Sequence, residues 1–237
     1  MNNFTKFAVA AAAVFSLQAQ AAVGDVFDGF TVDQFVQDLT QGGAGTGVWS
    51  GAVAGADIFG GKREIYVEKT SNASTVVGIQ AGVDQGRFFF NEGTGQIGHS
   101  ILRYDGGDLA GNAGPNYTAL LGNLLTFGTG FAFTYSSDLD FDIQIKVYDI
   151  TGAVKSQTLG AIGTGGTDQY GEILFADLVG AADLTKVGAV EIIFNQLTGT
   201  GRVDLDFTAP TGIPEPGSLA LAGLALLGLG AARRRKA

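Results

Sequence analysis

Short runs of Val, Ile, Thr, Phe and Tyr between glycine-rich turns are the feature that most restricts the fold of this chain. In residues 141–149, Phe141, Ile143 and Ile145 alternate with polar neighbours, so a strand here buries one face and leaves the other in water. The 38 glycines of the chain punctuate such strands at their turns. The pattern predicts an all-β fold, an antiparallel β-sandwich with a jelly-roll-like arrangement, because no helical period separates the runs.

About ten strands are predicted from these runs. They cover residues 63–70, 75–83, 87–91, 100–104, 131–135, 141–149, 155–159, 171–175, 189–195 and 202–207. Gln85 and Gly86 predict a tight turn between the second and third of these strands. A helical turn is expected over residues 33–39, ahead of the first strand.

Cysteine is absent from the sequence, which excludes disulfides, thiol catalysis and cysteine-based zinc sites. The formal net charge is −9, and five of the 14 cations lie at the two ends of the chain, as Lys6 and within residues 233–236. Without these five cations, nine basic and 23 acidic residues leave a charge near −14. We therefore expect no nucleic-acid partner, because such a surface repels phosphates.

The N-terminal residues have the order of a secretory signal peptide. Lys6 precedes an apolar run of 11 residues, 7–17, which suits a signal peptide and is too short to span a bilayer. Ala19 and Ala21 then form the small-x-small pattern that signal peptidase accepts, so cleavage is predicted after Ala21. The alternative is a short buried helix, which does not explain the order of charge, apolar run and small residues.

The C-terminal residues predict a membrane anchor. Prolines at positions 210, 214 and 216 favour an extended linker, and residues 218–232 then hold only Leu, Ala and Gly after Ser218. These 15 residues make a helix of about 22 Å, a short span for a hydrocarbon core of about 30 Å. The basic residues 233–236 stay cytoplasmic under the positive-inside rule, which leaves the body outside the inner membrane. The alternative is an apolar helix packed on the domain.

The C-terminal tail also resembles a known sorting signal. Pro214-Glu215-Pro216, an apolar span, and the cluster Arg233, Arg234 and Arg235 look like the PEP-CTERM signal. The resemblance implies processing by an exosortase-like membrane protease, transient anchoring in the inner membrane, and release to the cell surface or the extracellular space. It also implies a bacterium that makes exopolysaccharide.

The resulting organisation has five parts. They are a signal peptide (1–21), a β-sandwich ectodomain (22–209), a Pro-rich linker with the PEP motif (210–217), a transmembrane helix (218–232) and a basic cytoplasmic tail (233–237). The ectodomain itself is similar to a poorly characterised kind found on other PEP-CTERM proteins, through residues 59–64, 104–106 and 204–207. That similarity implies a sandwich and says nothing about an activity.

Catalytic motifs are weak, so no catalytic residue is assigned and the body is predicted to be non-enzymatic. His99 is the single histidine, and no Gly-x-Ser-x-Gly elbow accompanies it. Residues 93–98 match the dinucleotide spacing Gly-x-Gly-x-x-Gly, but a strand instead of a helix is predicted to follow. Paired carboxylates of a glycoside hydrolase remain the least favoured alternative, from Glu64, Glu68, Glu92, Glu172 and Glu191.

Aspartates suggest one structural ion. Asp138, Asp140 and Asp142 are predicted to share a strand face, and Asp204 and Asp206 repeat the pattern near the C-terminus. Carboxylate oxygens are the ligands that calcium prefers, so calcium is a hypothesis here, and no other cofactor is expected. The alternative is a solvated acidic face.

Aromatic residues suggest a contact with sugar. Trp49, Tyr66, Tyr104 and Tyr117 could stack on pyranose rings, although aromatics more commonly pack in cores. The sequence therefore favours an exported surface or matrix protein without enzymatic activity. The alternative is a carbohydrate-binding module that acts on exopolysaccharide.

Overall fold

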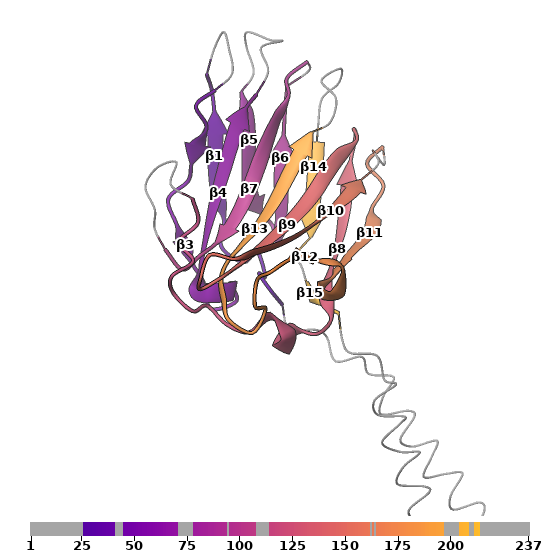
Figure 1. The fold of residues 1–237 in the computed structure, drawn as a ribbon. Coiled ribbons are helices and arrows are strands. Elements are labelled where there is room, and N and C mark those ends of the chain that lie inside the picture. Colours follow the sequence, from indigo (N-terminus) through magenta and orange to yellow (C-terminus); the bar gives the residue numbers. More distant parts are fainter. Residues whose placement is uncertain are drawn as a thin grey trace, which may run out of the picture. The chain divides into compact units, whose positions relative to one another are not determined.

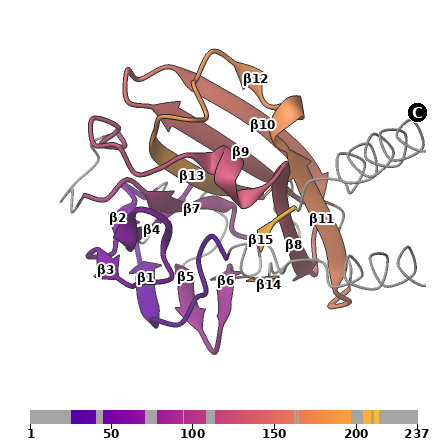
Figure 2. The same cartoon turned by 90° about the horizontal axis from the view of Figure 1, so that it is seen from below.

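Two antiparallel β-sheets face each other in the computed structural model (Figure 1). Figure 2 shows the layers from below, with β9, β10 and β13 in the upper layer and β1, β5 and β6 in the lower one. Every strand pair is antiparallel, and the predicted antiparallel β-sandwich is confirmed.

The structure describes residues 26–40, 45–70, 78–93, 95–107, 114–161, 163, 165–196, 204–208 and 211–213. They belong to one unit, Asp25–Ile213. The predicted signal peptide, transmembrane helix and basic tail lie outside the described residues. Within the described part, the structure contains no helix with the length and apolar character needed to cross a bilayer.

The seven-stranded sheet has the order β1-β5-β6-β14-β8-β11, and β15 also pairs with β8. Its strands are β1 (Gln34–Asp38), β5 (Ile79–Asp84), β6 (Arg87–Asn91), β14 (Asp204–Thr208), β8 (Gly130–Ser137), β11 (Gln169–Leu174) and β15 (Thr211–Gly212).

The eight-stranded sheet has the order β12-β10-β9-β13-β7-β4-β2, and β3 also pairs with β4. Its strands are β12 (Val179–Gly180), β10 (Val154–Ala161), β9 (Phe141–Asp149), β13 (Val187–Gln196), β7 (Gly98–Tyr104), β4 (Lys62–Lys69), β2 (Val48–Trp49) and β3 (Val53–Ala54). Three short 3-10 helices lie in the connections of the described part: Phe59–Gly61, Leu124–Phe127 and Phe175–Asp177.

Aromatic side chains from both sheets fill the space between the layers. Phe88 of β6 stacks on Phe194 of β13 with ring centroids 4.8 Å apart, and Phe194 also meets the edge of Phe207 of β14 at 5.1 Å. All three are fully buried. Burial of each such ring stabilises the fold by about 1.5–3 kcal/mol. The alternation along the strands directs these rings inward, and their packing holds the two sheets together.

Two strand predictions match the structure residue for residue, because 87–91 is β6 and 141–149 is β9. The predicted turn at Gln85 and Gly86 is also confirmed. Both residues have positive φ, 50° and 80°, as a two-residue type I′ hairpin requires.

The expected helical turn over residues 33–39 is wrong, since this segment forms β1. Gln34, Val36 and Asp38 are buried, which is the period of two of a strand, and Val36 pairs with Ala81 of β5. The predicted end of the ectodomain at position 209 is also too early. Thr211 and Gly212 pair with β8, and the Ile213 N–H donates to the carbonyl of Gly130 at 2.9 Å.

A buried ion pair links the segment before β1 to β4. Arg63 and Asp28 have fully buried side chains, and Arg63 Nη1 donates to both carboxylate oxygens at 3.0 and 2.8 Å. Tyr104 donates its hydroxyl to the same carboxylate at 3.0 Å. The other guanidinium nitrogens donate to the Val32 carbonyl and to Gln34 Oε1, at 2.6 and 2.9 Å. Every charged atom of the pair is thus paired, as a buried charge requires.

Candidate functional site

Two phenylalanines form a platform on the outer face of the seven-stranded sheet. The strand register places Phe35 of β1 opposite Gly82 of β5, and Gly82 opposite Phe89 of β6. Successive residues of a strand point to opposite faces, so Phe88 and Phe90 enter the core while Phe89 points outward. Among the residues that the structure describes, Phe35 is the one phenylalanine with more than half of its surface exposed, at 57%.

Gly82 leaves the room that the Phe89 ring occupies. A Cβ atom at this position would lie 2.7 Å from Cζ of Phe89, so any other side chain would displace that ring. The ring centroids of Phe35 and Phe89 are 6.4 Å apart, and their planes are inclined by 34°. The two rings therefore lie next to each other above the strand that separates them.

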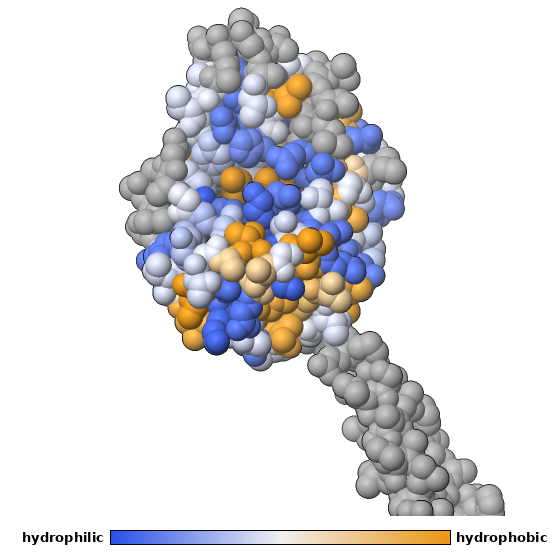
Figure 3. Space-filling model, viewed as in Figure 1, coloured by the Kyte–Doolittle hydropathy of each residue, from blue (hydrophilic) through white to orange (hydrophobic). Residues whose placement is uncertain are grey.

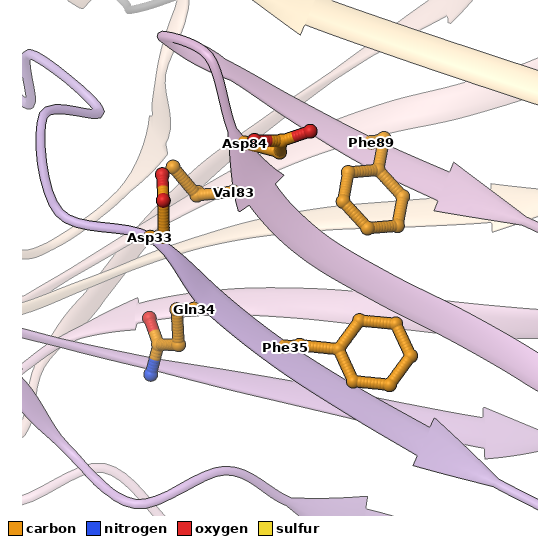
Figure 4. A pocket seen from close by; sticks show the side chains of 6 residues that line it. All are labelled: Asp33, Gln34, Phe35, Val83, Asp84 and Phe89. Carbon is orange, nitrogen blue, oxygen red and sulfur yellow. The ribbon is translucent and has the colours of Figure 1, made fainter.

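The platform belongs to a shallow groove of about 410 Å³ (Figure 4). Its lining residues are Asp33, Gln34, Phe35, Val83, Asp84 and Phe89. Figure 4 shows the rings of Phe35 and Phe89 on the same side, with β5 between them, and the carboxylates of Asp33 and Asp84 near the end of β5. Both aspartates are exposed, so the groove combines apolar ring faces with negative charge.

Gln34 fixes the base of the groove. Its amide nitrogen donates to Ser50 Oγ at 2.7 Å and to the Gly51 carbonyl at 2.8 Å, and its amide oxygen accepts from Arg63. Only 8% of its surface is exposed. The backbone beside Phe35 is therefore held by the buried ion pair, so the platform is largely preformed.

The sequence prediction of a glycan contact named other aromatics, and it is wrong for Tyr104. This side chain lies in the core with no exposed surface and donates to Asp28. Burial, with the charge of Asp28 as a further cause, raises the pKa of its hydroxyl well above the usual value. A residue in that place cannot stack on a sugar in solution.

Trp49 and Tyr66 do come together, on the outer face of the eight-stranded sheet, with ring centroids 4.8 Å apart. Their faces are largely occupied, because the Arg103 guanidinium lies 3.9 Å from the Trp49 ring centroid and Tyr66 is only 8% exposed. Tyr117 stacks on Tyr148 instead, 6.4 Å away. Figure 3 views the molecule from this side, and hydrophobic residues gather there in its lower half among hydrophilic ones.

The carboxylates proposed for hydrolysis are spread over several strands. Glu64 and Glu191 flank Arg103 in the register, and both oxygens of Glu191 are engaged, by Arg103 at 2.9 Å and by the Tyr148 hydroxyl at 2.8 Å. Glu68 accepts from the Tyr66 hydroxyl at 2.7 Å. Carboxylates held in this way are engaged in hydrogen bonds that stabilise the fold.

The single histidine, His99, lies on β7, with Nε2 3.6 Å from Glu68 Oε2. Burial lowers the pKa of His99 below its usual value, and the Glu68 charge offsets only part of this effect. The imidazole is therefore mostly neutral at pH 7. The segment 93–98 leads into β7, which begins at Gly98, so a strand follows where a dinucleotide would need a helix.

The proposed calcium ligands do not share one strand face. Asp138 and Asp140 lie in the turn between β8 and β9, and only Asp142 lies on β9. Asp140 Oδ1 accepts from the Gly163 N–H at 2.7 Å. Asp204 and Asp206 belong to β14 of the other sheet, and their side chains lie outside the described residues.

Within the described residues, no three carboxylate or imidazole groups gather into a site that could hold a metal ion. The strand-face argument for calcium is wrong, because a turn separates Asp138 and Asp140 from Asp142. Calcium binding itself stays a prediction.

Comparison with known proteins identifies the C-terminal segment. Residues 212–236 match the family model of the PEP-CTERM protein-sorting motif. The chain carries a PEP-CTERM sorting motif. This confirms the resemblance seen at Pro214–Pro216 and at the terminal arginines, and it marks an exported, sorted protein. No curated protein matches the chain.

Solved structures similar to this chain include an agarase, AgWH50C, with a TM-score of 0.41 and 11% identity over 58% of this chain and 22% of the agarase. The chain therefore spans about a fifth of that enzyme. The family 11 carbohydrate-binding module of Clostridium thermocellum Lic26A-Cel5E has a TM-score of 0.39 and 12% identity over 83% of this chain and 98% of the module. A structure from a study of carbohydrate-binding modules of the β-sandwich superfamily has a TM-score of 0.31 and 14% identity, over 80% and 61% of the two chains. At these TM-scores the likenesses carry no information about what this chain binds.

Proposed function

We propose that this PEP-CTERM protein is a non-enzymatic surface or matrix protein that binds polysaccharide in the groove of Phe35 and Phe89. The observation that supports this most is the exposure of Phe35 beside Phe89 on the outer sheet face. Leaving a phenylalanine ring in water costs free energy unless a ligand covers it, and pyranose rings present apolar faces of matching size.

Several further features agree with a binding role. The groove is shallow and open to solvent, and Gln34 beneath it is held by four hydrogen bonds. The glutamates considered for hydrolysis lie outside its lining. Polysaccharide binding is therefore the function that this geometry favours.

Replacing either ring should weaken glycan binding. With the full chain and a panel of bacterial exopolysaccharides in affinity electrophoresis, Phe35→Ala and Phe89→Ala should each reduce the affinity about tenfold, which is about 1.4 kcal/mol. Tyr170→Ala is the matched control, because Tyr170 is an aromatic residue 64% exposed on β11 of the same sheet. Equal losses in all three variants, or no binding by the parent protein, would contradict the proposal.

The route to the surface follows from the two ends of the chain. We propose that signal peptidase cleaves after Ala21, that residues 218–232 hold the protein briefly in the inner membrane, and that an exosortase-like protease then cuts near Pro214–Pro216. The ectodomain is then released to the cell surface or the surrounding matrix.

Deleting Pro214, Glu215 and Pro216 should stop this release. The protein should then accumulate in the membrane fraction at its uncut mass, because the protease has no recognition segment. Immunoblots of membrane and medium fractions measure this, with Pro210→Ala as the control outside the motif. Release of the deletion variant at the parental rate would rule the sorting model out.

A further inference from the structure

The charge of the groove indicates which glycan it takes, an inference that rests on the proposed function. Asp33 and Asp84 are the two charged residues among the six that line it, and both are exposed. We infer that the ligand is a glycan with free amino groups. Its pyranose rings stack on Phe35 and Phe89 while its ammonium groups meet the two carboxylates.

The two carboxylates are available to a ligand. Within the described residues, no cation forms a salt bridge with Asp33 or Asp84, and the one side-chain hydrogen bond to Asp84 is a long one from Gln85, at 3.5 Å. Arg87 lies opposite Asp84 in the register, but its Nη1 is 3.9 Å from the carboxylate of Asp168. Both carboxylates are thus open to solvent, and a ligand that carries positive charge can pair with them.

The aromatic rings add to the preference for an amine. A cation near the face of a phenylalanine ring is attracted by the ring quadrupole, and an ammonium group on a stacked sugar is held close to such a face. The same groove disfavours uronic acids, because their carboxylates would approach Asp33 and Asp84 under a field from a body with a charge near −14. Charge and stacking thus select the same class of sugar.

Isothermal titration of the full chain tests this with three probes: a glucosamine hexamer, an N-acetylglucosamine hexamer and a lysine hexapeptide. At about pH 5.5 and low salt, the glucosamine hexamer should bind about tenfold more tightly than its acetylated form, and added salt should reduce that advantage. The double variant Asp33→Asn/Asp84→Asn should remove the advantage. Glu172→Gln, an exposed carboxylate on β11 of the same sheet, should keep it.

The outcomes distinguish the preference for amino groups from polysaccharide binding itself. If both hexamers bind equally and Phe35→Ala weakens both, the amine inference is overturned and polysaccharide binding stands. If the lysine peptide binds as tightly as the glucosamine hexamer, the groove is a site for basic peptides and the inference is overturned. If the double variant keeps the full preference for glucosamine, the carboxylates are not its cause. If no glycan in either experiment binds, the proposed function itself fails.

Discussion

Replacing Arg63 with methionine is expected to lower the free energy of unfolding by about 3–5 kcal/mol. The variant leaves the carboxylate of Asp28 without its cation in a place with no exposed surface. It also removes the donors to the Val32 carbonyl and to Gln34 Oε1. Chemical denaturation of parent and variant, followed by tryptophan fluorescence, measures the difference.

Two further variants test whether the loss of stability comes from the unpaired charge of Asp28. Asp28→Asn/Arg63→Met should be less destabilised than the sum of the single variants, because it removes both charges together. Lys186→Met breaks an exposed ion pair with Asp183, in which both side chains are more than 40% exposed, and should change stability by less than about 1 kcal/mol. Additive losses at Arg63 and Asp28 would show that the pair is not coupled.

The stability of the domain should fall as the pH rises from about 4.5 to about 8. Glu92 is 2% exposed, and burial raises its pKa from 4.5 to about 8. The nearby Gly98 N–H lowers the pKa of Glu92 and offsets part of this effect. Within the described residues, neither carboxyl oxygen of Glu92 has a hydrogen-bond partner. The folded protein therefore keeps a proton on Glu92 that the unfolded chain has already lost.

The direction of the effect follows from the proton count. Between the two pKa values the folded state binds more protons than the unfolded state, so stability is full at low pH and is lost toward pH 8. The slope is about 1.4 kcal/mol per pH unit, and the total on the order of 3–5 kcal/mol. His99 acts in the opposite direction, because its lowered pKa costs stability as the pH falls below its usual value of 6.5.

The variant Glu92→Gln isolates this contribution, because it keeps the shape of the side chain and removes the titration. Compared with the parent, it should become more stable by a margin that grows with pH, while His99 contributes equally to both proteins. Glu172→Gln, at an exposed glutamate, is the control and should leave the slope of the parent unchanged. Parallel stability curves for the parent and Glu92→Gln would show that Glu92 is ionised in the folded protein.

Alternation along single strands could be predicted from the sequence, and it located most of the sandwich. Phe141, Ile143 and Ile145 define an inner face without any knowledge of the neighbouring strands. The three phenylalanines at 88–90 also carried a usable signal, because a strand that buries Phe88 and Phe90 must expose Phe89. That reasoning would have found half of the aromatic platform.

The other half depends on contacts between residues far apart in the sequence. Phe35 lies beside Phe89 only because β1 pairs with β5 and Gly82 separates the two rings. The sequence of residues 33–39 does not indicate that register. The burial of Tyr104 could not be predicted for the same reason, since its hydroxyl pairs with Asp28, which lies 76 residues away. Local patterns give the face of a residue within its strand, whereas register and ion pairing decide what that face meets.

The position of β14 constrains the order in which this protein can fold. Residues 204–208 pair with β6 on one side and β8 on the other, so the strand completes the middle of its sheet. Until these residues are available, β6 and β8 lack their common neighbour, and the incomplete sheet exposes backbone groups that can pair with other chains. The sheet can therefore close only after the chain has been made as far as β14, so nearly the whole β-sandwich must be present before this layer is complete.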